Sequence, residues 1–322
     1  MSKTLRFLVG VLTAFAATTG AAVADTFPSK TVRIICPYSP GGTVDILARV
    51  MAEKLSKYWG QQVIVENRPG VAGQVATRYV ATQPADGYTM LITASGHPIN
   101  HLLYKDLAYD SFKDFSPVTQ LGRGSLVLVV NKDSKYSNLA DFIAAAKTGK
   151  EKVSYGHVGL GTSSWMGGAL LEHMTNTKLL GVPYKGGVPA LTDLMGGQID
   201  SNFNIIPEAI AHIKAGSVKA LATTGSARAQ ALPDVPTVSE TVPGYSFGAY
   251  WIILGPAGVP ANVIAKVNEG MNRALKEPDV VERLSNLGVE PIGTSPNQVA
   301  ELMREDARKW KPIFDAAGIK PQ

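Results

Sequence analysis

Residues 31–59 read TVRIICPYSPGGTVDILARVMAEKLSKYW, and this stretch decides the fold class. Thr31–Pro37 is mostly apolar and predicts a buried strand, and the prolines and glycines that follow it predict a tight turn. From Val44 to Trp59, apolar side chains recur at helical spacing, so we expect an amphipathic helix with Gly60 as its C-terminal cap. A strand, a turn and a helix in this order are the repeating unit of an α/β fold.

The same alternation continues along the chain. Further strands are expected at Gln61–Glu66, Tyr88–Thr93, Leu126–Val130, Lys152–Tyr155, Leu179–Val182, Gln198–Phe203, Val218–Thr223 and Tyr245–Leu254. Further helices are expected at 74–82, 138–147, Thr162–Thr175, Pro189–Met195, Pro207–Ala215, Ala261–Leu275, Asp279–Leu287 and Pro296–Phe314. This order predicts parallel sheets with helices on both faces. We expect two α/β domains, the second beginning near Leu126, and a last helix that returns to the first domain and braces both.

Length and composition narrow the class of protein. The 322 residues are 45% hydrophobic and 18% charged, which excludes a disordered chain, a collagen and a coiled coil. The formal charge of +5 comes from scattered residues without a basic cluster, so we expect no nucleic-acid binding. Cys36 is the only cysteine, which rules out an internal disulfide, and its place in the first strand predicts a buried, inert thiol.

The first residues have the pattern of an export signal. Lys3 and Arg6 precede the apolar run Phe7–Ala17, and Ala22-Val23-Ala24 is a small-x-small pattern, so we expect cleavage after Ala24. The apolar run of about eleven residues is too short for a bilayer, which takes ~20, and no later segment is long and apolar enough. We therefore expect an exported chain without a membrane span. Its formal charge falls to +3, because the leader holds two basic and no acidic residues.

Turns that follow the predicted strands are the candidate binding sites. Open parallel sheets bind ligands at the carboxyl ends of their strands. Glycines in such turns let backbone N–H groups approach a ligand, and a helix N-terminus behind them favours an anion. The alternative for each turn is purely structural, a tight turn or a helix cap. The candidate ligand-binding residues are Tyr38, Ser39, Gly41, Gly42, Thr43, Thr93, Ala94, Ser95, Gly96, His97, Gly161, Thr162, Ser163, Trp165, Tyr184, Lys185, Gly186, Asn202 and Asn204.

Catalytic and metal-binding patterns are missing from the sequence. It contains no G-x-S-x-G, no H-E-x-x-H and no cysteine pair. His97 and His101 are four residues apart, but no third ligand with metal-site spacing accompanies them. Gly159–Trp165 resembles half of a dinucleotide fingerprint and lacks its third glycine. We therefore expect no catalytic residue, no metal and no other cofactor, and an exported binding protein is the favoured class.

Several segments of this sequence carry a family resemblance. The chain resembles the TctC/Bug family of extracytoplasmic solute receptors, which serve tripartite tricarboxylate transporters. The resemblance runs from about Phe27 to the C-terminus and rests on Pro28–Ile35, Pro40–Arg49, Val65–Gly70, Pro84–Thr89, Lys113–Phe115, Val182–Gly187 and Leu232–Thr237.

The resemblance implies a type II periplasmic-binding-protein fold, in which two Rossmann-like lobes close on a ligand in a central cleft. Lobe 1 would comprise residues 25–125 and about 241–322, and lobe 2 residues 126–240. The ligand would be a small carboxylate, held by backbone amides, hydroxyls and ordered waters. The receptor, a monomer in the periplasm of a Gram-negative bacterium, would deliver it to a membrane permease. Two alternatives stay open: a sensor component that signals to a membrane kinase, and an exported hydrolase that uses Ser95 or Ser163.

The sequence departs from the family pattern at two positions. Many relatives carry an Asp-Asn pair near the position of Asn204, and a His where this chain has Trp165. Asn204 would remove a negative charge from the cleft. Trp165 would offer an apolar face to an aromatic or bulky carboxylate, or would point into the helix packing instead. Asp45 matches a family motif and is expected to organise its loop from the helix N-terminus, without binding the ligand.

Overall fold

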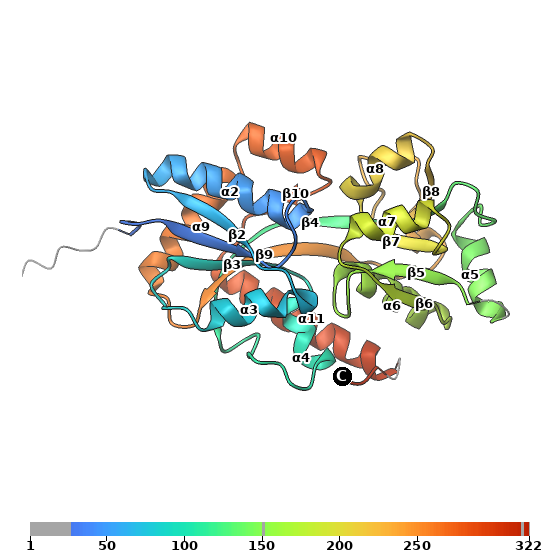
Figure 1. Ribbon diagram of the computed structural model, residues 1–322, viewed down its shortest axis with the longest axis horizontal. Helices are drawn as coiled ribbons and strands as arrows, with labels where there is room; N and C mark the ends of the chain where they lie inside the picture. The colour runs from blue at the N-terminus through green and yellow to red at the C-terminus, as the bar shows by residue number, and fades with distance from the viewer. Residues whose placement is uncertain (1–26, 150–151, 317–318, 322) are drawn as a thin grey trace, which may run out of the picture.

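The structure is a computed structural model that describes residues 27–149, 152–316 and 319–321. The expected export signal, residues 1–24, with its cleavage after Ala24, lies outside the described residues. Two α/β halves lie side by side, each with a central sheet and helices on both faces (Figure 1). This arrangement confirms the predicted fold class of two lobes.

The order of the elements follows the predicted alternation. The first half contains β1 (Val32–Cys36), α2 (Thr43–Trp59), β2 (Val63–Asn67), η1 (Val71–Gly73), α3 (Gln74–Ala81), β3 (Thr89–Ala94), η2 (His97–Ile99) and α4 (Asn100–Leu103). After β4 (Phe115–Asn131), the second half contains α5 (Leu139–Thr148), β5 (Ser154–His157), α6 (Ser163–Thr175), β6 (Leu180–Pro183), α7 (Gly187–Met195), β7 (Ser201–Ile205), α8 (Ile206–Lys214) and β8 (Val218–Thr223). The remaining elements are η3 (Val238–Glu240), β9 (Gly248–Pro256), α9 (Ala261–Ala274), α10 (Pro278–Asn286), β10 (Glu290–Pro291) and α11 (Pro296–Ala316).

The strands pair in the order β2-β1-β3-β9-β4-β7-β5-β6, with β8 and β10 pairing with β4. β1 is parallel to β2 and β3, and β5 is parallel to β6 and β7, as the alternation predicts. β9 is antiparallel to β3 and β4, and β4 is antiparallel to β7 and β8. The expectation of purely parallel sheets is therefore wrong for β4 and β9. The chain enters the second half along β4 and turns back along β9, so these two strands must run in opposite directions.

β4 is one long strand that changes partners midway. Residues 115–125 pair with β9, whereas residues 126–131 pair with β7 and β8. The sequence predicts only Leu126–Val130 as strand, because the preceding part contains Pro117, two glycines and polar residues and has two register shifts. The predicted division into residues 25–125 with 241–322 and residues 126–240 stays a proposal, and the change of partners lies at its first boundary.

The first strand and helix pack as their sequence predicts. Leu47, Val50, Met51 and Leu55 of α2 are buried, and Gly60 ends the helix in the left-handed conformation with its N–H bonded to the Ser56 carbonyl. Helical spacing of the apolar residues thus supplies one buried face. The thiol of Cys36 lies in the same core, where burial raises its pKa to about 11, as expected for an inert cysteine.

The C-terminal helix α11 contacts both halves. Trp310 packs edge-on against Phe247 at 5.7 Å between ring centroids, and Phe314 lies 5.5 Å from Trp165 of α6. α11 also packs against β4 and against η2 of the first half. The expectation that the last helix braces both halves is confirmed.

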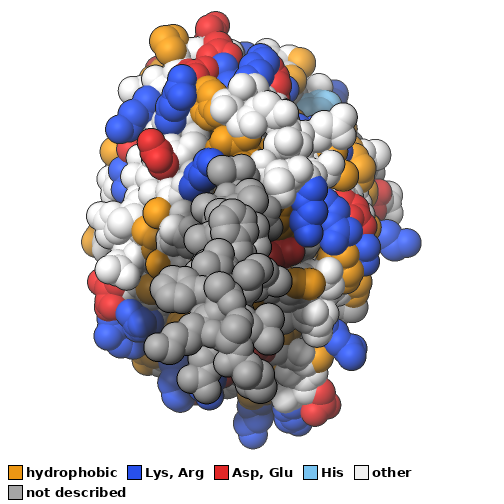
Figure 2. Space-filling view, turned by 90° about the vertical axis from the view of Figure 1, so that its left-hand side faces the viewer, with side chains coloured by type: hydrophobic (Ala, Val, Ile, Leu, Met, Phe, Trp, Pro, Cys, Tyr) orange, Lys and Arg blue, Asp and Glu red, His pale blue; other side chains and the backbone are white. Residues whose placement is uncertain are grey.

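Two further observations concern the surface charges and the lengths of the helices. On the face shown in Figure 2, Lys and Arg side chains are dispersed and stand among Asp and Glu side chains. In the part of the chain that the structure describes, no helix combines the length and apolarity needed to cross a bilayer.

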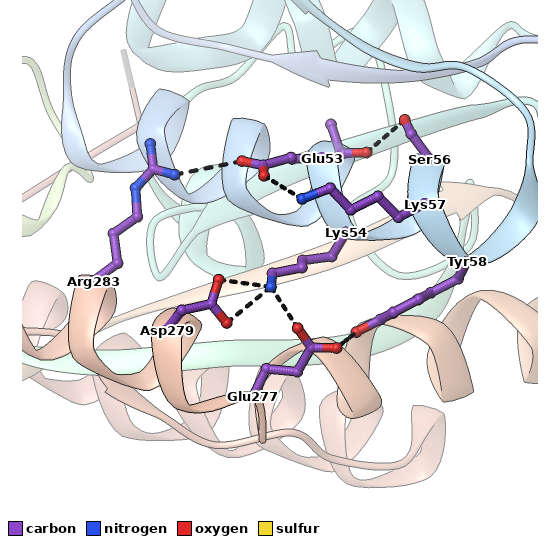
Figure 3. A network of polar contacts seen from close by, with 9 residues as sticks. Glu53, Lys54, Ser56, Lys57, Tyr58, Glu277, Asp279 and Arg283 are labelled. Atoms are coloured by element: carbon purple, nitrogen blue, oxygen red, sulfur yellow. Dashed lines mark hydrogen bonds and ion pairs between the residues drawn. The ribbon is translucent and has the colours of Figure 1, made fainter.

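A network of charges fastens α2 to the segment between α9 and α10 (Figure 3). Lys54, which is only 8% exposed, donates to Glu277 and to both carboxylate oxygens of Asp279 at 2.8 and 2.7 Å. Tyr58 donates to the second oxygen of Glu277. Hydrogen bonds from Lys54 hold the pKa values of Glu277 and Asp279 below their ordinary range. The network therefore fixes α10 beside α2.

Replacing Lys54 tests how much this network contributes to stability. In Lys54→Met, two carboxylates lose their common cation, so we expect the thermal midpoint at pH 7 to fall by several degrees. Lys57→Met is the matched control, because Lys57 makes an exposed pair with Glu53 at 2.8 Å and such pairs contribute little. Differential scanning calorimetry measures both midpoints. Equal shifts in the two variants would show that the network adds nothing beyond an ordinary surface pair.

Candidate ligand-binding site

The loop between β1 and α2 is held open toward solvent by its glycines and by Asp45. Gly41 has φ +87°, a left-handed conformation that favours glycine, and a Cβ there would meet nothing within 4 Å. Gly42 is the N-cap of α2, and no side chain caps this helix. Its first N–H groups therefore lack the side-chain partner that a capping Ser or Asp would supply.

Asp45 organises this loop, as its position in the first turn predicts. Its carboxylate accepts hydrogen bonds from the Gly41 N–H at 2.9 Å, from Arg49 Nε at 2.9 Å and from Asn67 Nδ2 at 2.8 Å. Burial alone would raise the pKa of Asp45, but these three donors outweigh it and the pKa lies below its ordinary value. Asp45 is 2% exposed, and its carboxylate already accepts three hydrogen bonds. It therefore shapes the loop and is not available to bind a solute.

The loop after β3 places Ser95 where the two halves meet. Ser95 Oγ lies 3.2 Å from Ser163 Oγ of the other half, and the Ser95 N–H bonds to the Tyr250 carbonyl at 3.1 Å. Ser95 is buried, as Thr93 and Ala94 before it are, at 1%, 5% and 8% exposure. The hydroxyl of Ser95 is the side-chain group of this loop that contacts the second half.

The side chain of His97 is packed in the core of the first half. Its ring is 2% exposed, stacks on Tyr109 and meets Phe115 edge-on. Its Nε2 lies 3.2 Å from the Ser111 carbonyl, and Ser111 Oγ donates to the His97 carbonyl at 2.7 Å. Burial lowers the pKa of His97 to about 4, so the ring is neutral at pH 7. Its Nδ1 has no partner among the described residues, and a contact of His97 with the ligand stays a prediction.

The loop after β5 is a second turn that ends at a helix N-terminus. Gly161 has φ +78°, and Thr162 is the N-cap of α6, again without a side-chain cap bond. Thr162 Oγ1 instead donates to the Gly159 carbonyl at 2.6 Å. Ser164 Oγ accepts from the Val158 N–H at 3.1 Å. Internal hydrogen bonds thus shape the turn and leave Ser163 as its outward hydroxyl.

Trp165 points into the helix packing. It is 7% exposed and its ring lies 5.5 Å from Phe314 of α11. Of the two alternatives that the sequence leaves open, the structure supports packing.

The loops after β3 and β5 touch one another. A Cβ placed on Gly96 would lie 2.2 Å from the Gly161 carbonyl oxygen, so this approach requires glycine. Tyr104 donates to the Leu160 carbonyl at 3.1 Å, and Gly161 lies against Asn100. Asn100 and Tyr104 were not among the predicted site residues, although they lie a few residues after the Thr93–His97 turn and carry polar groups.

The remaining candidates lie around β7 and the start of α7. Tyr184 donates to Asp193 at 2.9 Å, Lys185 is exposed, and Gly186 is the N-cap of α7 without a side-chain cap bond. Asn202 and Asn204 are each 1% exposed, and Asn202 Nδ2 and Asn204 Oδ1 have no hydrogen-bond partner among the described residues. This end of the second half therefore contains buried polar atoms that the protein itself does not pair.

The candidate residues lie in three places. The Tyr38–Thr43 loop belongs to the first half alone. The structure brings Ser95 and Gly96 against Gly161 and Ser163, from opposite halves. A third group, near Asn204 and Gly186, belongs to the second half alone. A separate cavity of about 710 Å³ is lined by parts of β4, β9 and α11, and none of the candidate residues lines it. No group of three or more His, Cys, Asp and Glu residues suited to a metal ion occurs within residues 27–149, 152–316 and 319–321.

The hydrolase alternative finds no support in the geometry around the two serines. Ser95 and Ser163 pair with each other, and no histidine hydrogen bond to either is found within the described ranges. The nearby His97 faces Ser111. A serine nucleophile needs a base within hydrogen-bond reach, and neither serine has one.

Two α/β lobes joined by crossing strands, with the loops after β3 and β5 in contact between them, are the architecture of a two-lobed solute-binding protein. A sequence profile described as "Tripartite tricarboxylate transporter family receptor" (TctC) matches residues 47–319. The chain belongs to this family of solute receptors.

Individual relatives agree with this assignment. Protein BugT of Bordetella pertussis is 32% identical over 319 residues, which cover 97% of this chain and 98% of BugT. An R. palustris protein solved with adipate has a TM-score of 0.87 at 32% identity, over 92% of this chain and 100% of that one. MatC of Rhodopseudomonas palustris, solved with bound malate, has a TM-score of 0.82 at 32% identity, over 89% and 99%. The predicted resemblance to the TctC/Bug family is confirmed.

The neutral burial of His97 predicts a pH dependence of stability. The pKa is about 4 in the folded protein and 6.5 for an ordinary histidine, so the unfolded chain takes up the proton first as the pH falls. This stabilisation is present above pH 6.5 and is lost between pH 6.5 and about 4, by about 3 kcal/mol at most. His97→Gln should show a smaller loss of unfolding free energy between pH 7 and 5 than the wild type, in denaturant titrations. His101→Gln, an exposed control, should keep the wild-type slope, and an unchanged slope in His97→Gln would contradict this account.

Proposed function

We propose that this protein is a periplasmic receptor that captures a small carboxylate between its lobes and delivers it to the membrane permease of a tripartite tricarboxylate-type transporter. The observation that carries the proposal is the meeting of Ser95 and Ser163 across the lobes, beside the uncapped N-terminus of α6. Helix N-termini and hydroxyls favour an anion without needing a cationic side chain. Solved neighbours named with adipate and malate support a carboxylate as the class of ligand.

The binding mechanism is capture without chemistry. One end of the carboxylate would lie in the turns of Tyr38–Thr43 and Thr93–Gly96, and closure would bring Gly161–Ser163 and Tyr184–Gly186 onto it. A micromolar affinity takes about −8 kcal/mol. Hydrogen bonds to a charged group contribute ~1.5–3 kcal/mol each, so a few of them suffice before ordering costs are subtracted. In this mechanism, the backbone N–H groups of the glycine turns donate these hydrogen bonds to the carboxylate.

The partner and the location follow from the family. Its receptors serve tripartite tricarboxylate transporters, so the proposed partner is the membrane permease and the proposed place is the periplasm, after cleavage near Ala24. We propose that the receptor is a monomer. A pull-down from solubilised membranes, with and without a carboxylate, tests the partner. Capture of a permease subunit supports a role in transport. Capture of a sensor kinase alone would contradict transport and support the signalling alternative.

A thermal-shift screen tests the class of ligand. A ligand that binds only the folded state raises the midpoint by mass action, by an amount that grows with its concentration above Kd. We expect a concentration-dependent rise with at least one of a set of di-, tri-, amino and aromatic carboxylates at fixed pH and ionic strength. If no carboxylate raises the midpoint, the proposed function is wrong.

A pair of glycine variants tests the place of binding. Gly41→Asp and Gly60→Asp both put a side chain at positive φ, into space with nothing within 4 Å, at opposite ends of α2. Only the variant at Gly41 adds a negative charge to the proposed anion site, so it should lower carboxylate affinity at least about tenfold. Gly60→Asp should bind like the wild type. Isothermal titration calorimetry on both folded variants decides, and equal affinities would refute the assignment of this loop.

A further inference from the structure

The carboxyl group of Glu208 lies beside a turn that we propose to bind an anion, where an acidic residue is least expected. Glu208 belongs to the first turn of α8, directly after β7. A Cβ placed on Gly187 would lie 2.1 Å from Glu208 Oε2 and 3.2 Å from Oε1. The carboxyl group of Glu208 therefore lies against the backbone where the Tyr184–Gly186 turn enters α7. The same close approach explains why position 187 requires glycine.

The protein pairs this carboxyl group poorly. Its one hydrogen bond comes from Asn204 Nδ2, at a long 3.4 Å, and no ion pair among the described residues includes Glu208. Burial raises the pKa of Glu208, and the bond from Asn204 only partly opposes this. Three donors hold the buried carboxylate of Asp45 in its charged form. No comparable set of donors surrounds Glu208 in the part of the chain that the structure describes.

Neighbouring charges do not supply the missing cation. On α7, Asp193 accepts from the Tyr184 hydroxyl at 2.9 Å. Lys185, in the turn before α7, is exposed. On α8 itself, His212 and Lys214 lie in the last turn, and no contact between them and Glu208 is found in the described ranges. The carboxyl group is therefore free to receive a cation from outside the protein.

Two further buried atoms beside Glu208 have no partner. Asn202 and Asn204 are two residues apart on β7, so their side chains share one face of the strand. Asn204 Oδ1 is an acceptor and Asn202 Nδ2 is a donor, and both amides are 1% exposed. Buried polar atoms without partners cost free energy, and such groups mark a place where another molecule completes the hydrogen bonds. The acceptors available here are Glu208 and Asn204 Oδ1.

We propose that Glu208 and Asn204 form a subsite for the protonated amine of the ligand, so that the solute is an amino carboxylate and not a dicarboxylate. This inference rests on the proposed function, which places the carboxylate end at the glycine turns. An ammonium group has three donors and no acceptor, which matches a carboxylate and an amide oxygen. At Glu208 and Asn204 Oδ1, a second carboxylate would place its acceptor oxygens against other acceptors. Glu208 therefore determines which functional group the cleft accepts at the end of the ligand that lies away from the glycine turns.

Matched pairs of solutes provide the test. Isothermal titration calorimetry compares 4-aminobutyrate with succinate and 6-aminohexanoate with adipate, on the purified full chain at pH 7. We expect the wild type to bind the better amino carboxylate at least about tenfold more tightly than its dicarboxylate partner. Glu208→Gln should weaken the amino carboxylate by about tenfold or more and leave the dicarboxylate unchanged or tighter.

Glu172→Gln is the control variant. Glu172 is another half-buried carboxyl group of the second half with a raised pKa, but it accepts from the Leu179 N–H at 2.7 Å, and Gln can keep that bond. It should retain the wild-type preference. A wild type that prefers the dicarboxylates overturns the inference whether or not Glu208→Gln folds, and so does an unchanged ratio in folded Glu208→Gln. Binding of dicarboxylates alone would leave the proposed function standing, whereas binding of no carboxylate at all would refute both.

Discussion

One continuous strand, β4, determines how the two lobes can be arranged. Its first part hydrogen-bonds to β9 and its second part to β7 and β8, so a single extended backbone belongs to both sheets. Backbone hydrogen bonds along such a strand cannot be given up without leaving buried N–H and C=O groups unpaired. The lobes are therefore held at a fixed separation along β4, while the loops at their strand ends face one another. Every contact between Ser95, Gly96, Gly161 and Ser163 depends on this placement.

The proposed binding surface consists mainly of uncharged groups. Asp45, the acidic residue of the first loop, is fully engaged by Gly41, Arg49 and Asn67 and serves to shape the turn. The Gly41 N–H is bonded to Asp45, whereas the first turns of α2 and α6 have no side-chain cap for their backbone N–H groups. In the proposed mode of binding, a weakly positive chain attracts an anion locally without a cluster of Lys or Arg. On such a surface, a single poorly paired carboxyl group such as that of Glu208 would have a large effect on selectivity.

The sequence predicted the repeating elements well, because each has a local cause. The apolar spacing of α2 and its Gly60 cap both act within a few residues, and both are present in the structure. The first part of β4 could not be predicted, because its glycines and polar residues become a strand only through pairing with β9. The directions of the His97 and Trp165 side chains could not be decided from the sequence for the same reason: their partners, Ser111 and Phe314, are brought there by the tertiary fold. Glu208 was not among the predicted site residues, because its burial results from the tertiary fold and no local sequence motif indicates it.

The aromatic seam of the C-terminal helix has a consequence for how the lobes move. Phe314 touches Trp165 of the second lobe, and Trp310 touches Phe247 beside the crossing strand β9. Flat rings keep much of their contact area when they slide over one another, whereas hydrogen bonds weaken steeply as their angle changes. A rotation of the second lobe would thus shear this seam at little enthalpic cost. The seam would limit how far the lobes separate, while the direct polar contacts between them, such as Ser95 with Ser163 and Tyr104 with Leu160, would decide the angle at which they come to rest.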